Sequence, residues 1–109
     1  MKKLALAAAA ALMLCTAVQA QPMLADRHVE RGQQCAACHM ESPPAKAVDA
    51  QTCLNCHGGY DKLKERTKDS KVNPHYTHML EQPCSECHKG HQQSVNMCND
   101  CHKFEFKVP

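Results

Sequence analysis

The sequence has little of the material from which most soluble proteins build a core. It contains no tryptophan and no isoleucine, and only two phenylalanines and two tyrosines. From residue 21 onward, Leu, Val and Phe together number eleven among 89 residues, about 12%, whereas less than about 20% is typical of disordered chains. This segment should not fold by burying its own side chains, and we expect a cofactor to supply its core.

The sequence also lacks a strand pattern and an excess of charge. No alternating strand pattern appears, so we expect minimal β structure. The chain has 13 Lys and Arg against 11 Asp and Glu, and without Lys2 and Lys3 both counts equal 11. A balance so close to neutral gives no support to nucleic-acid binding.

Cysteine and histidine are abundant instead, with nine and eight residues. Four copies of Cys-x-x-Cys-His occur, at 35–39, 53–57, 84–88 and 98–102. This motif attaches a c-type haem, because two thiols add to the porphyrin vinyl groups and the adjacent histidine ligates the iron. We predict four covalently bound haem c groups. The attaching and proximal residues are Cys35, Cys38, His39, Cys53, Cys56, His57, Cys84, Cys87, His88, Cys98, Cys101 and His102.

Zinc and disulfides are the alternatives. Cys-x-x-Cys alone also serves thioredoxin-like and zinc-ribbon sites, and Cys38 and Cys53 enclose a stretch that a four-cysteine zinc site could tolerate. The histidine at the fifth position of all four copies favours haem.

Four histidines remain, one for the distal side of every iron: His28, His75, His78 and His91. The methionines after residue 20 are the competing ligands: Met23, Met40, Met79 and Met97. Met40 directly follows His39 and Met97 directly precedes Cys98, so neither can reach the far face of its own haem. We therefore expect bis-histidine ligation, with methionine as flexible apolar filler.

The reach of the chain limits how the histidines can pair. Two histidines on opposite faces of one iron have alpha carbons roughly 12 Å apart, since each Fe–N bond is about 2 Å. His91 lies three residues after His88, and three residues extend at most about 11 Å. His91 should therefore serve a different haem. His75 and His78, also three apart, most naturally serve two neighbouring irons.

The N-terminus has the pattern of a secretory signal peptide. Met1 to Lys3 is positive, 4–18 is apolar, and Val18-Gln19-Ala20 offers small residues for cleavage. We expect cleavage after Ala20 and a single tetrahaem domain over 21–109. About 15 apolar residues fall short of the roughly 20 needed to span a bilayer, so stable membrane insertion is not expected.

Cys15 lies in this apolar run, where a lipoprotein would carry its modified cysteine. The preceding Leu14 is too large for that processing, so Cys15 should leave with the signal peptide. Because thioether attachment takes place outside the cytoplasmic membrane, we expect a periplasmic protein of a Gram-negative bacterium.

The segment from 21 to 109 otherwise predicts loops with short helices. Prolines punctuate the loops, Gly58-Gly59 predicts a turn or helix stop, and helical turns are expected around each motif. The best helical stretch is 61–71, where acidic and basic side chains interleave. We interpret it as a solvated helix, with a basic docking patch as the alternative.

The histidine pattern resembles the small tetrahaem cytochromes c and the haem domain of flavocytochrome c fumarate reductases. The resemblance rests on His28 before the first motif, on the pair His75-x-x-His78 and on His91 three residues after His88. It implies four low-spin haems in a compact loop-and-helix fold that moves electrons in anaerobic respiration. The flavocytochromes continue into a flavin domain, whereas this sequence ends at Pro109, so we expect an electron carrier and no catalytic residues.

Two functions follow from these expectations. One is a soluble shuttle from a membrane quinol-oxidising cytochrome to terminal reductases. The other is a haem subunit bound to a separate flavoprotein that reduces fumarate or a related unsaturated carboxylate. Phe104 and Phe106 could dock such a partner or cover the last haem. A multihaem enzyme would need one iron with a free position.

Overall fold

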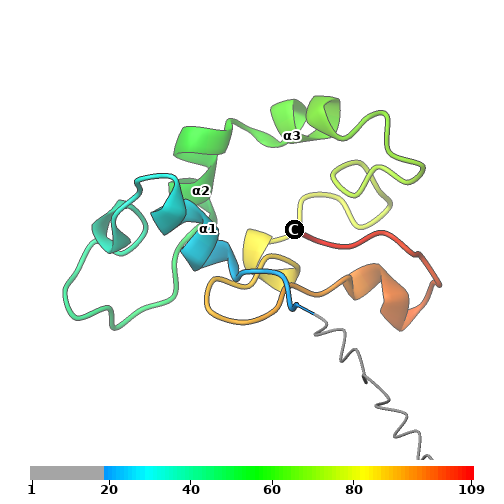
Figure 1. The fold of residues 1–109 in the computed structure, drawn as a ribbon. Coiled ribbons are helices and arrows are strands. Elements are labelled where there is room, and N and C mark those ends of the chain that lie inside the picture. Colours follow the sequence, from blue (N-terminus) through cyan, green and yellow to red (C-terminus); the bar gives the residue numbers. More distant parts are fainter. Residues whose placement is uncertain (1–18) are drawn as a thin grey trace, which may run out of the picture.

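The computed structural model describes residues 19–109 as short helices joined by long loops (Figure 1). Its helices are α1 (Leu24–Glu30), α2 (Ala50–His57) and α3 (Tyr60–Arg66), with 3-10 turns at Cys35–Ala37, Cys84–Glu86 and Met97–Asp100. No strand occurs between residues 19 and 109. The predicted fold class, short helices and loops with minimal β structure, is confirmed. Almost all of the predicted signal peptide lies outside the described residues.

Each Cys-x-x-Cys-His motif forms a helical turn. Three of the motifs are 3-10 turns, and the second forms the end of α2. In the 3-10 motifs the histidine N–H donates to the carbonyl of the first cysteine over 2.8 Å, in His39, His88 and His102 alike. This bond folds five residues into one compact turn, so both thiols and the imidazole project from the same short segment.

Glycine separates α2 from α3. Asp49 begins α2 by accepting a hydrogen bond from the Gln51 N–H over 2.7 Å. Gly58 ends it at φ 80° and donates its N–H to the Leu54 carbonyl over 2.8 Å. A positive φ is strained for any residue with a side chain. The predicted helix stop at Gly58-Gly59 is therefore confirmed.

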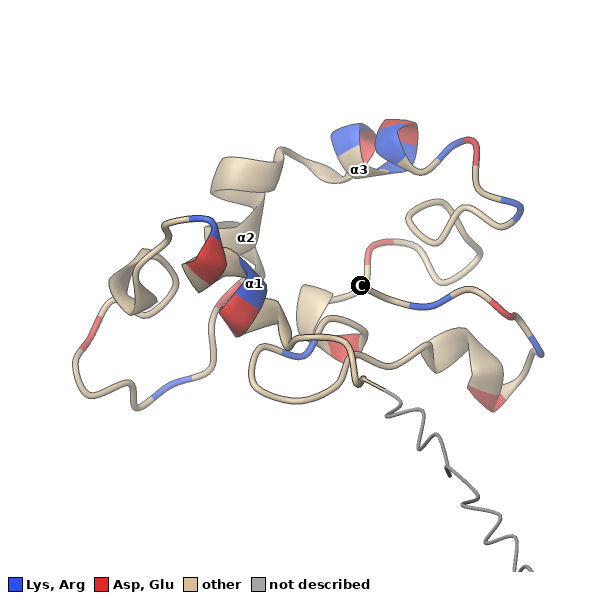
Figure 2. Cartoon of the chain, in the orientation of Figure 1, with Lys and Arg blue, Asp and Glu red and all other residues tan. Residues whose placement is uncertain are grey.

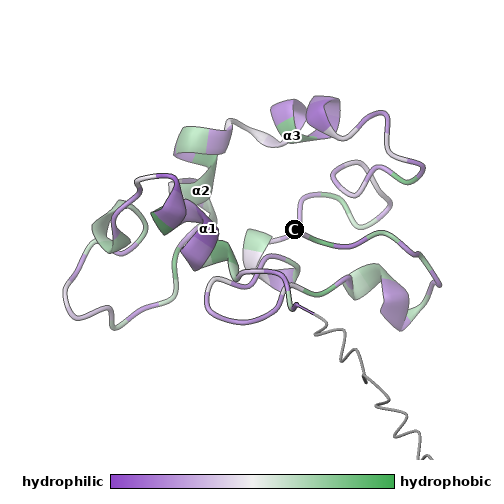
Figure 3. Ribbon diagram, in the orientation of Figure 1, coloured by the Kyte–Doolittle hydropathy of each residue, from purple (hydrophilic) through white to green (hydrophobic). Residues whose placement is uncertain are grey.

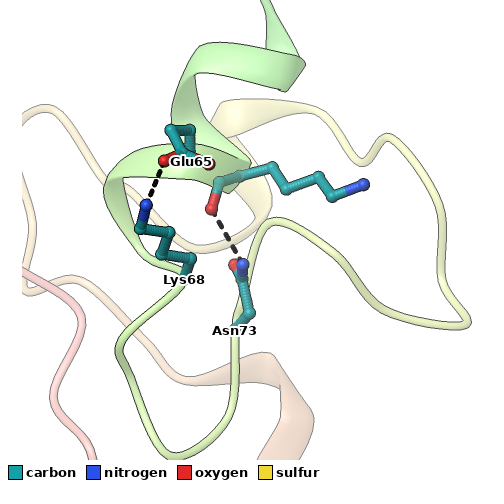
Figure 4. A network of polar contacts seen from close by, with 4 residues as sticks. Glu65, Lys68 and Asn73 are labelled. Carbon is teal, nitrogen blue, oxygen red and sulfur yellow. Dashed lines mark hydrogen bonds and ion pairs between the residues drawn. The ribbon is translucent and has the colours of Figure 1, made fainter.

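Helix α3 is shorter than the predicted stretch 61–71. It ends at Arg66 because side chains take the carbonyl groups of its last turn. The Thr67 hydroxyl bonds to the Leu63 carbonyl over 2.9 Å. The Asn73 amide donates to the Lys64 carbonyl over 2.9 Å (Figure 4). The chain therefore turns back after Thr67. The charged face is solvated as expected, with an exposed ion pair between Lys68 and Glu65.

The polypeptide does not bury an apolar core of its own. No residue between 19 and 109 is fully buried. Met40 and Leu80 are 82% and 81% exposed, and hydrophobic residues are spread over helices and loops alike (Figure 3). The lack of an apolar core expected from the composition is thus present in the folded chain.

A few long-range hydrogen bonds tie the loops together. The start of α1 meets the loop after the third motif, since the Ala25 N–H donates to the Gly90 carbonyl over 2.9 Å. Nearby, the Gln93 amide donates to the Gln21 carbonyl over 2.8 Å. Tyr60 at the start of α3 donates its hydroxyl to the Gln82 carbonyl over 2.6 Å. No helix among residues 19–109 is long and apolar enough to cross a membrane.

Candidate functional site

The eight histidines form four pairs of facing rings. Each pair joins one motif histidine to one of the other four, and every histidine is used once. The distances between ring centroids are 6.0 Å for His28 and His57, 6.0 Å for His39 and His91, 6.3 Å for His75 and His88, and 6.1 Å for His78 and His102.

A separation near 6 Å is what a metal between two imidazoles requires. A metal–nitrogen bond is about 2 Å, and the nitrogen of an imidazole lies about 1 Å from the ring centre, so two such ligands on opposite sides of one iron place their centroids roughly 6 Å apart. The four pairs therefore have the dimensions of bis-histidine haem sites.

The pairing joins segments that are distant in the sequence. His91 faces His39, 52 residues away, and not His88, three residues away. His75 and His78 face histidines of different motifs, the third and the fourth. This is the distribution that the reach of the chain favours. His28 on α1 faces His57 at the end of α2.

The ring planes fall into two classes. His39 and His91 are 12° from parallel, and His75 and His88 are 5° from parallel. The other two pairs are closer to perpendicular, at 70° for His28 with His57 and 61° for His78 with His102.

Hydrogen bonds fix the orientation of three rings through their Nδ1 atoms. His28 Nδ1 lies 2.8 Å from the Leu24 carbonyl, one helical turn back on α1. His75 Nδ1 lies 3.1 Å from the Thr67 hydroxyl oxygen, and His88 Nδ1 lies 3.2 Å from the Pro109 carbonyl. A ring that donates from Nδ1 keeps a lone pair on Nε2, which is the form that binds a metal.

Helix α3 holds the turn that carries His75 and His78. Lys64 Nζ lies 3.5 Å from the centre of the Tyr76 ring, between the two histidines in sequence. Asn73 also joins the start of the turn to α3, through the Lys64 carbonyl (Figure 4). Of the interleaved charges that marked this helix in the sequence (Figure 2), Lys64 thus contacts the turn that carries the two histidines.

The C-terminal segment covers the histidine of the fourth motif. The Phe104 ring stacks on His102 with 4.8 Å between centroids and 15° between planes, and Phe106 continues the stack at 6.0 Å. Asn99 fixes Phe104 by two hydrogen bonds, of 2.8 and 3.1 Å. Of the two roles considered for these aromatics, contact with the last motif is the one that the structure shows.

The surroundings of His75 and His57 favour the neutral imidazole, and those of Cys53 favour the protonated thiol. Burial, assisted by His88, lowers the pKa of His75, and burial with His28 nearby lowers the pKa of His57. Neutral imidazole is the form that ligates iron. Burial and the neighbouring Cys84 thiol raise the pKa of Cys53 to about 11. The second and third attachment sites are therefore neighbours.

Further features fit a large apolar cofactor with acidic edges. The Arg27 Nε, next to His28 in sequence, is buried and has no hydrogen-bond partner in the described part of the chain. A haem propionate would supply the acceptor that this guanidinium lacks. An open hollow of about 360 Å³ lies along the first motif, between Gln34 and Pro44. No group of three or more metal-binding side chains in residues 19–109 could hold a bare ion.

Comparison with known proteins identifies the family. The model of the family described as Cytochrome c3 matches residues 27–103. The chain belongs to the cytochrome c3 family. Membership implies covalently bound haem c, and it accounts for the attachment motifs and the histidines that face them.

Several curated relatives are larger proteins. A protein named "Probable fumarate reductase Ifc3" from Shewanella frigidimarina is 34% identical over 97 residues, which cover 84% of this chain and 16% of that protein. "Cytochrome c-type protein Cgr1" from Eggerthella lenta is 34% identical over 119 residues, which cover 80% of this chain and 55% of that protein. "Fumarate reductase (cytochrome)" of S. frigidimarina is 34% identical over all of this chain and 20% of its own length. The chain thus spans from about a sixth to about half of these relatives.

The sequence reasoning missed the residues that support the histidines. Thr67 and Asn73 lie outside the haem motifs, and Asn99 is one of the two variable positions of the fourth motif. Nothing in the spacing of these residues connects them with a histidine. Arg27 could have been noticed as a cation beside a predicted distal histidine.

Proposed function

We propose that this protein carries electrons through four c-type haems, each held between two histidines. The observation that carries the proposal is the arrangement of the eight histidines in four pairs near 6 Å, each with one histidine from an attachment motif. The attaching thiols are Cys35, Cys38, Cys53, Cys56, Cys84, Cys87, Cys98 and Cys101. The axial pairs are His28 with His57, His39 with His91, His75 with His88, and His78 with His102.

Bis-histidine ligation limits the chemistry to electron transfer. When bound, the haems supply reversible one-electron oxidation and reduction. An iron with both axial positions filled by imidazole has no position for a substrate. The chain's part is to fix the imidazoles, exclude water and hold the haem edges, with Arg27 paired to a propionate. Two histidines without methionine set low potentials, tuned by burial and hydrogen bonds.

The proposed setting is the periplasm of a Gram-negative bacterium during anaerobic respiration. There the signal peptide 1–20 is removed, and 21–109 acts as a soluble shuttle from a membrane quinol-oxidising cytochrome to terminal reductases. The 11 basic and 11 acidic side chains after residue 20 cancel, so the propionates make the loaded protein acidic. Partners with basic docking surfaces are therefore favoured.

A second candidate is a haem subunit that serves a separate flavoprotein reductase. It is favoured by the two relatives named as fumarate reductases, in which the matching region is 16% and 20% of the protein. In that arrangement the other subunit performs the reduction of fumarate or a related unsaturated carboxylate.

Purification from native periplasm under mild conditions tests both candidates. Mass spectrometry should show residues 21–109 with four added haems, and electron paramagnetic resonance should show low-spin ferric iron only. A solitary red protein supports the shuttle, whereas a stoichiometric flavoprotein with reductase activity supports the subunit. A high-spin ferric signal of about one haem per chain would contradict the bis-histidine proposal and point to an enzyme.

A further inference from the structure

Thr67, the residue that follows α3, joins the helix to a proposed haem ligand. Its hydroxyl oxygen lies 2.9 Å from the Leu63 carbonyl, 2.6 Å from Asn73 Oδ1 and 3.1 Å from His75 Nδ1. Ending a helix requires only the first of these contacts. The other two place the hydroxyl between the helix end and the imidazole.

The donors and acceptors around this hydroxyl determine which ring nitrogen of His75 carries the proton. Asn73 uses its Nδ2 to donate to the Lys64 carbonyl, so its Oδ1 faces Thr67 as an acceptor. The Leu63 carbonyl is also an acceptor, and the one hydroxyl proton goes to one of these two oxygens. A lone pair of the Thr67 oxygen then faces His75. Nδ1 of His75 therefore carries the proton and donates it, which leaves Nε2 free for iron.

The opposite ring of the same pair is held in the same way. His88 Nδ1 lies 3.2 Å from the Pro109 carbonyl, which also accepts from the Ser94 hydroxyl over 3.0 Å. Among the pairs formed by residues 19–109, this is the one in which both Nδ1 atoms have an acceptor. Its planes are also the most nearly parallel, at 5°.

We propose that Thr67 is a positioning residue that lowers the reduction potential of the haem held between His75 and His88. This inference rests on the proposed function, because it requires that haem to be present. An imidazole that donates a hydrogen bond from Nδ1 is a stronger electron donor at Nε2. Stronger donation stabilises ferric iron more than ferrous iron, and the potential falls.

Thr67→Val and Thr67→Ser test the role in the full-length, haem-loaded protein. Valine keeps the branched shape and removes the oxygen, whereas serine keeps the oxygen. The measurement is a redox titration followed by haem-resolved NMR. In Thr67→Val the potential of the haem at Cys84 and Cys87 should rise while the others change little. A roughly tenfold loss of preference for ferric iron corresponds to a rise of about 59 mV for one electron.

In Thr67→Ser the potential of the haem at Cys84 and Cys87 should return to the wild-type value. If Thr67 only ended the helix or packed against its neighbours, no such change confined to one haem would be expected. Equal potentials of this haem in Thr67→Val, Thr67→Ser and the wild type would overturn the inference. A similar rise at all four haems would also overturn it, since that indicates a general loosening of the fold.

The wild-type protein gives a second measurement that does not depend on the variants folding. The Nδ1 proton of His75 should exchange slowly with solvent and show a hydrogen-bonded NMR shift. Fast exchange would overturn the inference even with the haem bound by two histidines. A haem at Cys84 and Cys87 that is high-spin in the wild type would instead show that the proposed ligation fails.

Discussion

The chemistry of this chain depends on which histidine faces which. Each motif histidine is fixed by its own turn, so its partner must come from elsewhere in the chain, and the partners of His39 and His57 lie 52 and 29 residues away. Two histidines that are close in sequence therefore need not ligate the same iron. His91 follows His88 by three residues and yet faces His39.

Replacing His91 by methionine should change the haem attached at Cys35 and Cys38. Histidine/methionine ligation raises the potential relative to two histidines, so one of the four haems should titrate at higher potential. Haem-resolved NMR identifies which one. The matched variant His78→Met should instead raise the potential of the haem at Cys98 and Cys101. If His91→Met perturbs the haem at Cys84 and Cys87, the pairing described above is wrong.

At the scale of the elements, the helices are short because side chains and glycines end them early. Thr67 and Asn73 take the carbonyl groups at the end of α3, and Gly58 ends α2 with a positive φ. Only the second of these could be predicted, because glycine after a helical motif is a local signal. The early end of α3 depends on Asn73, nine residues after the carbonyl that it binds.

Replacing Gly58 by alanine should destabilise the junction of α2 and α3. At φ 80° a side chain is strained, and the added carbon would also clash with the Lys62 side chain. We expect a loss of about 1–3 kcal/mol in the free energy of unfolding, measured by denaturant titration of the loaded protein with circular dichroism.

Gly59→Ala is the matched control for this junction. Gly59 has φ −70° and nothing within 4 Å of an added carbon. Gly59→Ala should change the free energy of unfolding little, because alanine restricts the unfolded chain but is a poorer N-cap for α3 than glycine. Equal losses in the two variants would refute the role assigned to the positive φ.

At the scale of the whole molecule, the four histidine pairs differ in the angle between their rings. When the two imidazole planes are parallel, their π orbitals interact with the same iron d orbital of π symmetry. The energy of that d orbital then differs from the energy of the second d orbital of π symmetry. Perpendicular planes act on both orbitals and keep their energies close. The pairs at 5° and 12° should therefore differ spectroscopically from those at 61° and 70°.

Electron paramagnetic resonance of the fully oxidised protein should resolve two kinds of low-spin ferric haem. Two haems should give rhombic spectra, and two should give strongly anisotropic spectra with one dominant low-field feature. Spin quantification in frozen solution checks the ratio. His28→Met should remove one of the anisotropic signals and leave both rhombic signals unchanged. Four indistinguishable rhombic spectra would contradict the ring angles of His28 with His57 and of His78 with His102.

The sequence by itself determined the type of cofactor and the absence of a polypeptide core. Attachment needs two thiols and a histidine at fixed local spacing, and composition limits apolar burial wherever the residues lie. The fold class followed from the same facts. Sequence reasoning also assigned eight candidate ligands, because four spare histidines match four motifs, and it limited their pairing through the reach of the chain.

Only the tertiary structure decided the pairing, the angles between the rings and the residues that hold them. These depend on contacts such as Thr67 with His75 and Phe104 with His102. Such contacts arise from the path of the loops between the motifs, where no periodic pattern exists from which they could be predicted. The Cys-x-x-Cys-His motifs specify the cofactor, and the fold specifies which histidines face each other and at what angle.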